Sequence, residues 1–190
     1  MARLPYARLE DLPERARGLL ARLPRPLNIF RMAAHAHTSL RPLISLGASI
    51  LARHELSPKL RELAILRVAH VSDARYEWIQ HEALALAVGV SAEQIAVVAA
   101  GAITGPEFTA EEVSVLAFAD DVIANVRAGD ATLTAVREHL SEREVVELVL
   151  AVGYYMMLAR LMETSGVDLD EPVGQALLDS ARPGGMHIDE

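Results

Sequence analysis

Residues 59–71 read KLRELAILRVAHV, and this stretch decides the fold. Apolar side chains occur on nearly every side of the helix that the segment would form. A helix of this kind has no polar face to expose to solvent, so other helices are expected to surround it. The segment therefore predicts the central helix of an all-α, compact helical bundle.

Helix boundaries on either side of this segment are marked by capping residues. Ser57 followed by Pro58 indicates a helix start, because proline is tolerated in a first helical turn. Three pairs fit the reciprocal capping box, in which a hydroxyl side chain precedes Glu or Gln by three positions; they are Ser91 with Gln94, Thr109 with Glu112, and Ser141 with Glu144. Gly89, Gly129 and Gly166 are expected to end helices in the left-handed conformation.

These signals predict an all-helical chain. Helices are expected at 11–22, 28–36, 39–54, 58–72, 74–88, 92–100, 110–128, 131–140 and 142–164, with a short one near 173–181. In the helix that begins after Thr109, a buried stripe is expected from Val113, Leu116, Val122, Ile123 and Val126. The expected organisation is an N-terminal helical extension at 1–25, a helical domain at 26–167 and a C-terminal tail at 168–190.

Composition excludes several classes of function. The 190 residues can bury one substantial core, and the 52% that are apolar never form an uninterrupted run of about 20, so no membrane span is expected. The first residues lack the apolar stretch of a secretory signal, which predicts a cytoplasmic protein. A net charge of -8 argues against a nucleic-acid partner. With no cysteine, disulfides, thiolate catalysis and cysteine-ligated metals are excluded.

Acid–base chemistry is indicated by two consecutive helices. Glu62 lies in the nearly all-apolar helix, so its carboxylate needs a partner. In the next helix, Glu77 and His81 are four residues apart and share a face, with Trp78 beside them. A histidine with two carboxylates could relay protons near neutral pH. Equally, His81 could be a core histidine bonded to a carboxylate for structure.

The short turn at 72–74 predicts the geometry of this group. Glu62 is about ten residues before the turn and His81 about eight after it, so both reach similar heights on an antiparallel helix pair. We expect Glu62 to approach His81 to hydrogen-bonding or one-water distance and the pair to titrate as a coupled unit. Glu77 should lie one turn away, and Trp78 should wall the site.

The same residues carry a family resemblance. The stretch from Arg61 to His70, followed by Tyr76-Glu77-Trp78 and His81, resembles the central signature of the carboxymuconolactone decarboxylase and alkyl hydroperoxidase D superfamily. Further similar segments are Pro26 to Phe30, Gly89-Val90-Ser91, Phe118-Ala119-Asp120 and Gly153 to Arg160. The resemblance covers roughly residues 26–167 and implies a helical bundle of the alkyl hydroperoxidase D-like type.

Peroxidase activity is not expected despite this resemblance. Peroxidases of the superfamily use Cys-x-x-Cys-x-x-x-His with an upstream glutamate. Here His81 and Glu62 match the histidine and the glutamate, but Ala74 and Glu77 stand at the cysteine positions. A peroxidatic step needs a thiolate, so peroxidase chemistry is lost, whereas the proton-handling half of the site is kept.

The decarboxylase branch implies the leading hypothesis, a cofactor-free lyase or isomerase acting on a small carboxylated or lactone substrate. His81 would donate and accept the proton, and Glu62 and Glu77 would orient and tune it. Substrate contacts are expected from Trp78, Tyr76, His70 and Tyr154. His70 also suits the negative end of its helix, and the default for Tyr154 is a core or subunit contact.

Two alternatives remain open at this stage. The chain could be a non-catalytic oligomeric or small-ligand-binding protein in which Glu62, Glu77 and His81 form an internal polar network. These residues could also bind a metal, but Glu77 and His81 lack the i,i+3 spacing of di-iron bundles, and no metal is expected. His35 and His37 face different ways and favour capping or surface roles. The resemblance and the apolar helices also predict a homo-oligomer, as a dimer, trimer or hexamer.

Overall fold

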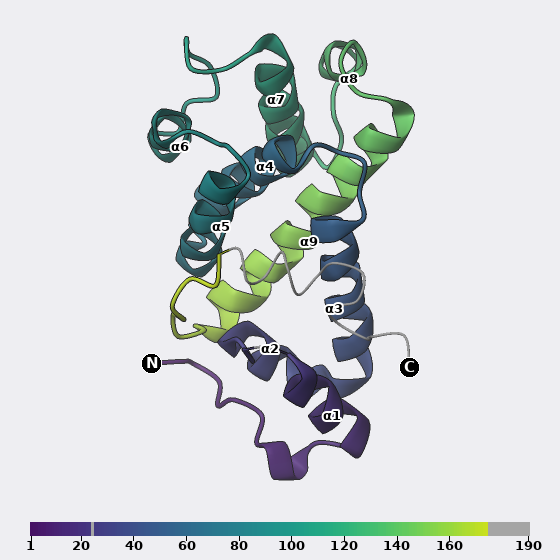
Figure 1. Cartoon of the computed structure of the whole chain (residues 1–190), viewed down its shortest axis with the longest axis vertical. Coiled ribbons are helices and arrows are strands. Elements are labelled where there is room, and N and C mark those ends of the chain that lie inside the picture. Colours follow the sequence, from purple (N-terminus) through teal and green to yellow (C-terminus); the bar gives the residue numbers. More distant parts are fainter. Residues whose placement is uncertain (24, 175–190) are drawn as a thin grey trace.

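A computed structural model describes residues 1–23 and 25–174, which form helices joined by turns, with no strand in these ranges (Figure 1). The elements in chain order are η1 (Leu9–Asp11), α1 (Glu14–Arg22), α2 (Asn28–Ala33), η2 (Ala34–Ala36), α3 (His37–Ala52), α4 (Pro58–Val71), α5 (Arg75–Ala87), α6 (Ala92–Ala99), α7 (Ala110–Asn125), α8 (Asp130–Arg137) and α9 (Glu142–Ser165). The predicted all-α bundle is confirmed.

Helix α4 lies at the centre, as its sequence predicts. Leu63, Ala64, Ile65 and Leu66 are all fully buried, and α5, α7 and α9 pack around the helix. An ion pair also holds α4 against α7. Arg67 donates from Nε and Nη2 to the two carboxylate oxygens of Asp120 on α7, at 2.5 and 2.9 Å.

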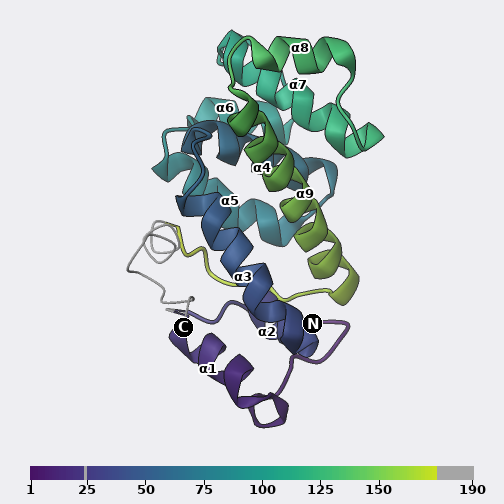
Figure 2. The ribbon, with the colours of Figure 1, turned by 90° about the vertical axis from the view of Figure 1, so that its right-hand side faces the viewer.

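The remaining helices extend the molecule at both ends. Helices α7 and α8 lie together at one end and α1 and α2 at the other, with α3 and α9 running between them (Figures 1 and 2). The N-terminal segment is tied to the segment after α9, because Tyr6 donates from its hydroxyl to Asp168 at 3.1 Å. The terminal amine pairs with the same carboxylate.

Local capping explains most of the helix boundaries. All three predicted capping boxes form, with the serine or threonine at the N-cap of α6, α7 and α9. Helix α4 begins at Pro58 as expected. Gly89 and Gly166 follow α5 and α9 with φ of 94° and 62°, the left-handed conformation predicted for them.

Gly129 is a correction to the sequence prediction. Helix α7 ends at Asn125, and Val126 takes the left-handed conformation there, with φ of 68° and 92% of its surface exposed rather than buried. Gly129 has φ of -68° and is the N-cap of α8. The reason is Asp121, whose carboxylate accepts from the Gly129 amide at 2.9 Å and from the Thr132 hydroxyl at 2.5 Å. These bonds favour an early exit from α7.

Two other boundaries differ. The expected break between 28–36 and 39–54 is a single 3-10 turn, η2, that leads directly into α3. The short helix expected near 173–181 is not formed at Val173 and Gly174, and its remaining residues lie outside the described ranges.

Helix α9 is long and apolar enough to cross a membrane by length and composition. Half of its most apolar stretch is buried inside the protein, where Leu148, Ala151 and Val152 are fully covered. One face of α9 is therefore part of the core.

Candidate functional site

The turn between α4 and α5 sets the geometry of the site. Asp73 takes a left-handed conformation, with φ of 49°, and the Ala74 amide donates to the Ala69 carbonyl at 2.9 Å. This closes α4 and reverses the chain within three residues. Helices α4 and α5 therefore run side by side, and Glu62 and His81 lie at the same height.

Glu62 and His81 form a buried pair. His81 Nδ1 lies 2.7 Å from Glu62 Oε2, so the predicted approach is confirmed. Because a carboxylate can only accept, Nδ1 carries the proton in the neutral ring and Nε2 is left as the acceptor. The His81 ring meets the Tyr155 ring of α9 edge to face, with centroids 4.6 Å apart. Glu62 is fully buried, and 5% of His81 is exposed.

Arg61 belongs to the same group of contacts as Glu62 and His81, and the sequence analysis did not predict its role. Its Nε donates to Glu62 Oε1 at 3.0 Å, and its Nη1 donates to the Ile50 carbonyl at 3.4 Å. The guanidinium is buried, and its Nη2 has no hydrogen-bond partner within the described part of the chain. The signal that could have found it is its position, since a helix buried on every side also buries the residue beside Glu62.

Glu77 stands apart from this line of contacts. Both of its carboxyl oxygens are buried without a hydrogen-bond partner among residues 1–23 and 25–174. Burial raises the pKa of Glu77 well above its usual range, and the charges of Glu163 and Glu62 raise it further. This shift favours the protonated, uncharged form of the carboxyl group. No hydrogen bond joins Glu77 to Glu62 or His81.

His70 and Trp78 lie together at a separate cavity. Their rings are edge to face with centroids 6.5 Å apart, and they line a cavity of about 270 Å³ with Asp73, Ala74 and Arg75 among the other lining residues. This cavity lies at the N-terminal end of α5. His81 does not line it, although it follows the lining residue Trp78 by only three positions, about 4.5 Å of helical rise.

Two residues expected to contact substrate, Tyr76 and Tyr154, form hydrogen bonds within the protein. Tyr76 donates from its hydroxyl to Asp170 Oδ2 at 2.5 Å, and Tyr154 donates to the Leu43 carbonyl at 3.0 Å. Burial raises the pKa of both phenols above their usual range. Their roles in substrate binding stay predictions, as do the catalytic roles of Glu62, Glu77 and His81.

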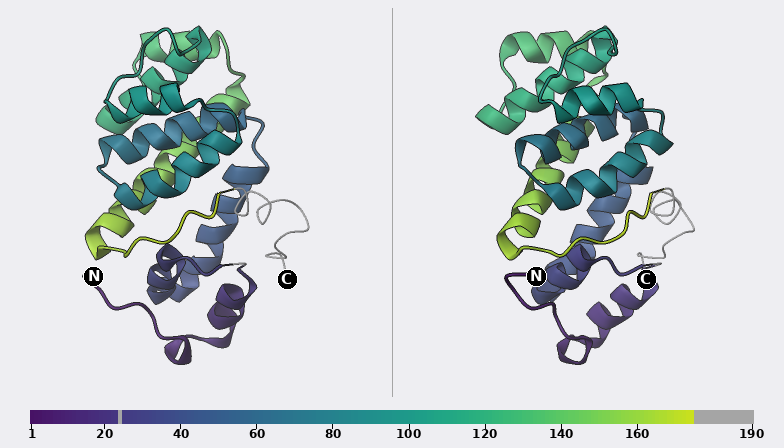
Figure 3. Two further views of the ribbon diagram at one scale, coloured as in Figure 1. Left: turned by 60° about the vertical axis from the view of Figure 1, so that its left-hand side comes forward. Right: turned by 90° about the vertical axis from the view of Figure 1, so that its left-hand side faces the viewer.

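Tyr76 helps to hold the segment that follows α9. Gln80 donates from Nε2 to the Asp170 carbonyl at 3.1 Å and accepts at Oε1 from the Val173 amide at 3.2 Å. Asp170 also accepts from the Asn28 amide at 2.6 Å. Residues 167–174, which we name the C-terminal strap, therefore run along α5 (Figure 3).

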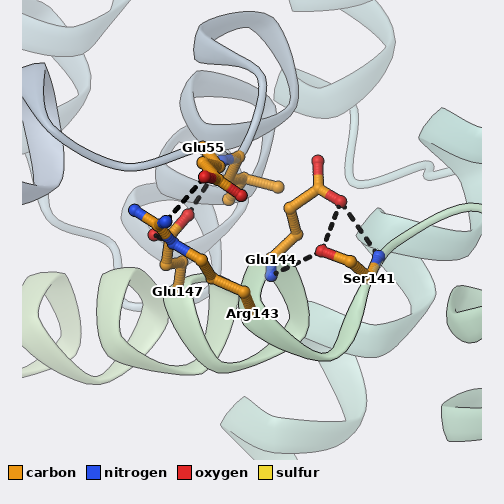
Figure 4. A network of polar contacts seen from close by, with 6 residues as sticks. Glu55, Ser141, Arg143, Glu144 and Glu147 are labelled. Carbon is orange, nitrogen blue, oxygen red and sulfur yellow. Dashed lines mark hydrogen bonds and ion pairs between the residues drawn. The ribbon is translucent and has the colours of Figure 1, made fainter.

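A polar network at the other end of α4 fixes the loop that precedes it. Arg143 donates to Glu55 at 2.6 Å and to Glu147 at 2.9 Å, and Glu147 accepts from the Leu56 amide at 2.8 Å (Figure 4). Burial would raise the pKa of Glu147, but these bonds outweigh it and hold that pKa below its usual range. The network anchors the α3–α4 loop on α9 and so sets the position of Arg61.

His54 lies in the same loop and was also missed. Its Nδ1 is buried and has no hydrogen-bond partner in the part of the chain described here. Burial lowers its pKa, with Glu147 acting in the opposite direction. Within the same described ranges, no group of three or more His, Asp or Glu side chains is arranged to hold a metal ion.

The chain has no cysteine, and its helical bundle holds a buried Glu/His pair with a buried Glu77 nearby. Residues 38–121 match the sequence profile of the carboxymuconolactone decarboxylase family. The matched segment contains Glu62, Glu77 and His81, and it supports the superfamily resemblance seen in the sequence. No curated protein sequence matches the chain.

Solved structures share the fold at low sequence identity. An uncharacterised peroxidase-related protein with an alkylhydroperoxidase AhpD core from Ralstonia eutropha JMP134 is 20% identical, with a TM-score of 0.73 over 89% of this chain and 92% of that one. An uncharacterised peroxidase-related protein from Silicibacter sp. TM1040 is 16% identical, with a TM-score of 0.74 over the same shares, 89% and 92%. A putative antioxidant defence protein AhpD from Agrobacterium tumefaciens is 20% identical, with a TM-score of 0.66 over 73% and 94%.

Proposed function

We propose that this protein is a cytoplasmic, cofactor-free lyase or isomerase that acts on a small carboxylated or lactone substrate. The observation that carries the proposal is the buried pair of Glu62 and His81, whose geometry holds Nδ1 protonated and presents Nε2 as the proton-transfer atom.

In a decarboxylation, the bond between the ring carbon and the substrate carboxylate breaks and carbon dioxide leaves. The electron pair is delocalised onto the lactone carbonyl oxygen, and the imidazolium of His81 then delivers its Nε2 proton to carbon. A proton from solvent restores the imidazolium. In an isomerisation, neutral His81 first removes a proton and returns it at another carbon. General acid–base catalysis of this kind contributes about 10² to 10⁴ in rate.

Charge balance favours an anionic substrate. Arg61 and Glu62 neutralise each other in the resting site, so protonation of His81 leaves one buried positive charge. A substrate carboxylate would compensate that charge, and the unpartnered Nη2 of Arg61 offers an N–H donor for it. The raised pKa of Glu77 favours its uncharged form, which would reduce repulsion of a bound anion.

Thiol peroxidase chemistry is not part of the proposal, although the structural relatives from Ralstonia and Silicibacter are described as peroxidase-related. In the family resemblance, Ala74 and Glu77 stand at the positions of the two redox cysteines. Neither side chain can form the sulfenic acid and disulfide that a peroxidatic cycle requires.

A second candidate is a small-ligand-binding protein without catalysis. It is favoured by one observation, that the cavity lined by His70 and Trp78 does not include His81. In this case the ligand would occupy the cavity at the start of α5, and the Glu62–His81 pair would stabilise the fold.

One experiment separates the two candidates. A panel of small carboxylated lactones and unsaturated acids is incubated with the protein in D₂O, with loss of carbon dioxide and deuterium uptake followed by NMR. Binding is followed in parallel by the fluorescence of Trp78, the single tryptophan. Turnover supports the lyase or isomerase. Saturable fluorescence change without turnover supports the binding protein and overturns the enzyme proposal.

A further inference from the structure

A second cavity lies where the N-terminal segment, α2, the start of α3 and the end of α9 meet, at the end of the molecule opposite α7 and α8 (Figure 2). It has a volume of about 420 Å³, and Leu4, Met32, Leu43 and Leu161 are among its lining residues. Within the described ranges it shares no lining residue with the cavity at the start of α5 and includes neither member of the Glu/His pair. We name it the N-terminal cavity.

The lining of the N-terminal cavity favours an aliphatic ligand. Of the described residues that line it, only His35 and Ser39 have polar side-chain atoms, and none is acidic. None is Phe, Tyr or Trp either, so a planar ring would find no stacking partner there. A cavity of about 150 Å³ can hold a benzene ring, so this larger volume has room for an aliphatic chain of about eight to twelve carbons.

His35 provides a polar contact at the edge of the N-terminal cavity. Its Nε2 lies 2.7 Å from the carbonyl oxygen of Pro5, which is also a lining residue. Because a carbonyl oxygen can only accept, Nε2 carries a proton, and Nδ1 is the ring nitrogen that can bind a ligand. His35 is exposed, so this edge of the cavity faces solvent. A ligand with one polar end could place that end at His35 and its chain inside.

The charge around the N-terminal cavity favours an anionic end group. Although the chain has a net charge of -8, residues 15–54 contain seven arginines and no Asp or Glu. This range includes α2, η2 and α3, which carry most of the lining residues. Among the acidic groups near the other walls, Asp168 pairs with the terminal amine, and the charge of Glu163 acts on Glu77 of α5. An anion is therefore attracted to this end of an otherwise acidic molecule.

We propose that the N-terminal cavity binds a medium-chain aliphatic carboxylate, with its hydrocarbon chain in the cavity and its carboxylate at Nδ1 of His35. The bound anion favours the imidazolium form of His35, in which Nδ1–H donates to the carboxylate while Nε2–H keeps its bond to the Pro5 carbonyl. This binding site does not depend on the reaction proposed for Glu62 and His81.

Isothermal titration calorimetry of the full chain with decanoate tests occupancy. We expect one decanoate per chain, with octanoate bound about tenfold more weakly because it lacks two methylene groups. Ser39→Phe fills the cavity and should weaken decanoate binding by at least about tenfold. Thr38→Phe, at an exposed neighbour outside the lining, is the matched control and should bind as wild type does. Absence of saturable decanoate binding, or binding that Ser39→Phe leaves unchanged, would overturn the proposal.

The carboxylate contact is tested by comparing decanoate with 1-decanol. His35→Gln keeps a donor for the Pro5 carbonyl but cannot become a cation, so it should weaken decanoate binding by about threefold to tenfold and leave decanol binding unchanged. His37→Gln, at an exposed histidine outside the lining, should alter neither. Equal losses for decanoate and decanol in His35→Gln would contradict the assignment of the carboxylate to His35.

Two further readouts distinguish other binding modes. Trp78 is the single tryptophan and lines the cavity at α5, so its emission should stay constant as decanoate binds. Cosedimentation with vesicles of an anionic phospholipid measures binding to a membrane surface. A change in Trp78 emission that follows the decanoate titration would place the ligand at α5 instead. Vesicle binding without binding of monomeric decanoate would identify a membrane surface and likewise refute the proposal.

Discussion

Nδ1 of His81 lies 2.7 Å from Oε2 of Glu62, and this bond joins two neighbouring helices inside the core. On its other side Glu62 accepts from Arg61, so one buried carboxylate holds two basic groups. Removing that carboxylate would leave the buried guanidinium without its counter-charge, which is costly in an apolar interior.

Glu62→Ala is therefore expected to lower the free energy of unfolding by about 3 to 5 kcal/mol. Glu62→Gln should cost less, because the amide oxygen still accepts one hydrogen bond. Urea titration followed by circular dichroism measures both. Glu138→Ala, at an exposed glutamate, should stay within about 0.5 kcal/mol of wild type. Equal stability of Glu62→Ala and Glu138→Ala would show that the pair contributes nothing to the fold.

The raised pKa of Glu77 predicts that the stability of the protein depends on pH. The unfolded chain releases the Glu77 proton near pH 4.5, whereas the native state keeps it to a higher pH because burial raises the pKa. Between these values the unfolded state binds fewer protons, so stability falls as pH rises. Glu77→Gln removes this loss. The variant should melt a few degrees above wild type at pH 7 and match it near pH 4, as thermal unfolding would measure. A variant less stable than wild type at pH 7 would contradict this expected pH dependence.

Much of this site could be predicted from the sequence, because it rests on local geometry. A three-residue turn between two helices fixes which of their residues lie at the same level along the helix axes. This is why the sequence predicts that Glu62 lies against His81. The partners of Tyr76 and Tyr154 could not be predicted in this way. Asp170 and Leu43 come from segments 94 and 111 residues distant, and no periodicity in the chain reports such contacts.

The C-terminal strap gives a third prediction. Asp170 accepts from both the Tyr76 hydroxyl and the Asn28 amide, so Asp170→Ala removes both bonds, whereas Tyr76→Phe removes one. Each bond contributes about 0.5 to 1.5 kcal/mol. Amide exchange by mass spectrometry should show faster exchange at 167–174 and at the start of α2, larger for Asp170→Ala than for Tyr76→Phe. Unchanged exchange at 167–174 in Asp170→Ala would contradict the assigned role of the strap contacts.

Gly101 gives a fourth prediction, on the cavity at α5. A Cβ atom there would lie 3.2 Å from Nε2 of His70, and Gly101 has φ of 85°. Gly89 has φ of 94° with open space around it. Both changes to alanine should cost about 1 kcal/mol through the left-handed backbone, but only Gly101→Ala should displace His70 and shift the emission of Trp78. An equal emission shift in Gly89→Ala would show that the emission of Trp78 does not report the position of His70.

The early end of α7 shows the limit of local signals. Glycine after an apolar helix predicts a stop, yet the Asp121 carboxylate binds the Gly129 amide and turns the glycine into the start of α8. The left-handed residue is then Val126, whose branched side chain gives no sign of that conformation in the sequence. A side-chain acceptor eight residues away decided this boundary.

The central claim is that His81, held by Glu62, transfers a proton to substrate carbon. It is tested most directly by the rate of deuterium incorporation from D₂O into a carboxylated lactone, compared between wild type, His81→Gln and Glu138→Ala. We predict that His81→Gln lowers the rate by about 10² to 10⁴, whereas Glu138→Ala, at an exposed residue outside the site, stays within a few-fold of wild type. Incorporation by His81→Gln at the wild-type rate would contradict the account.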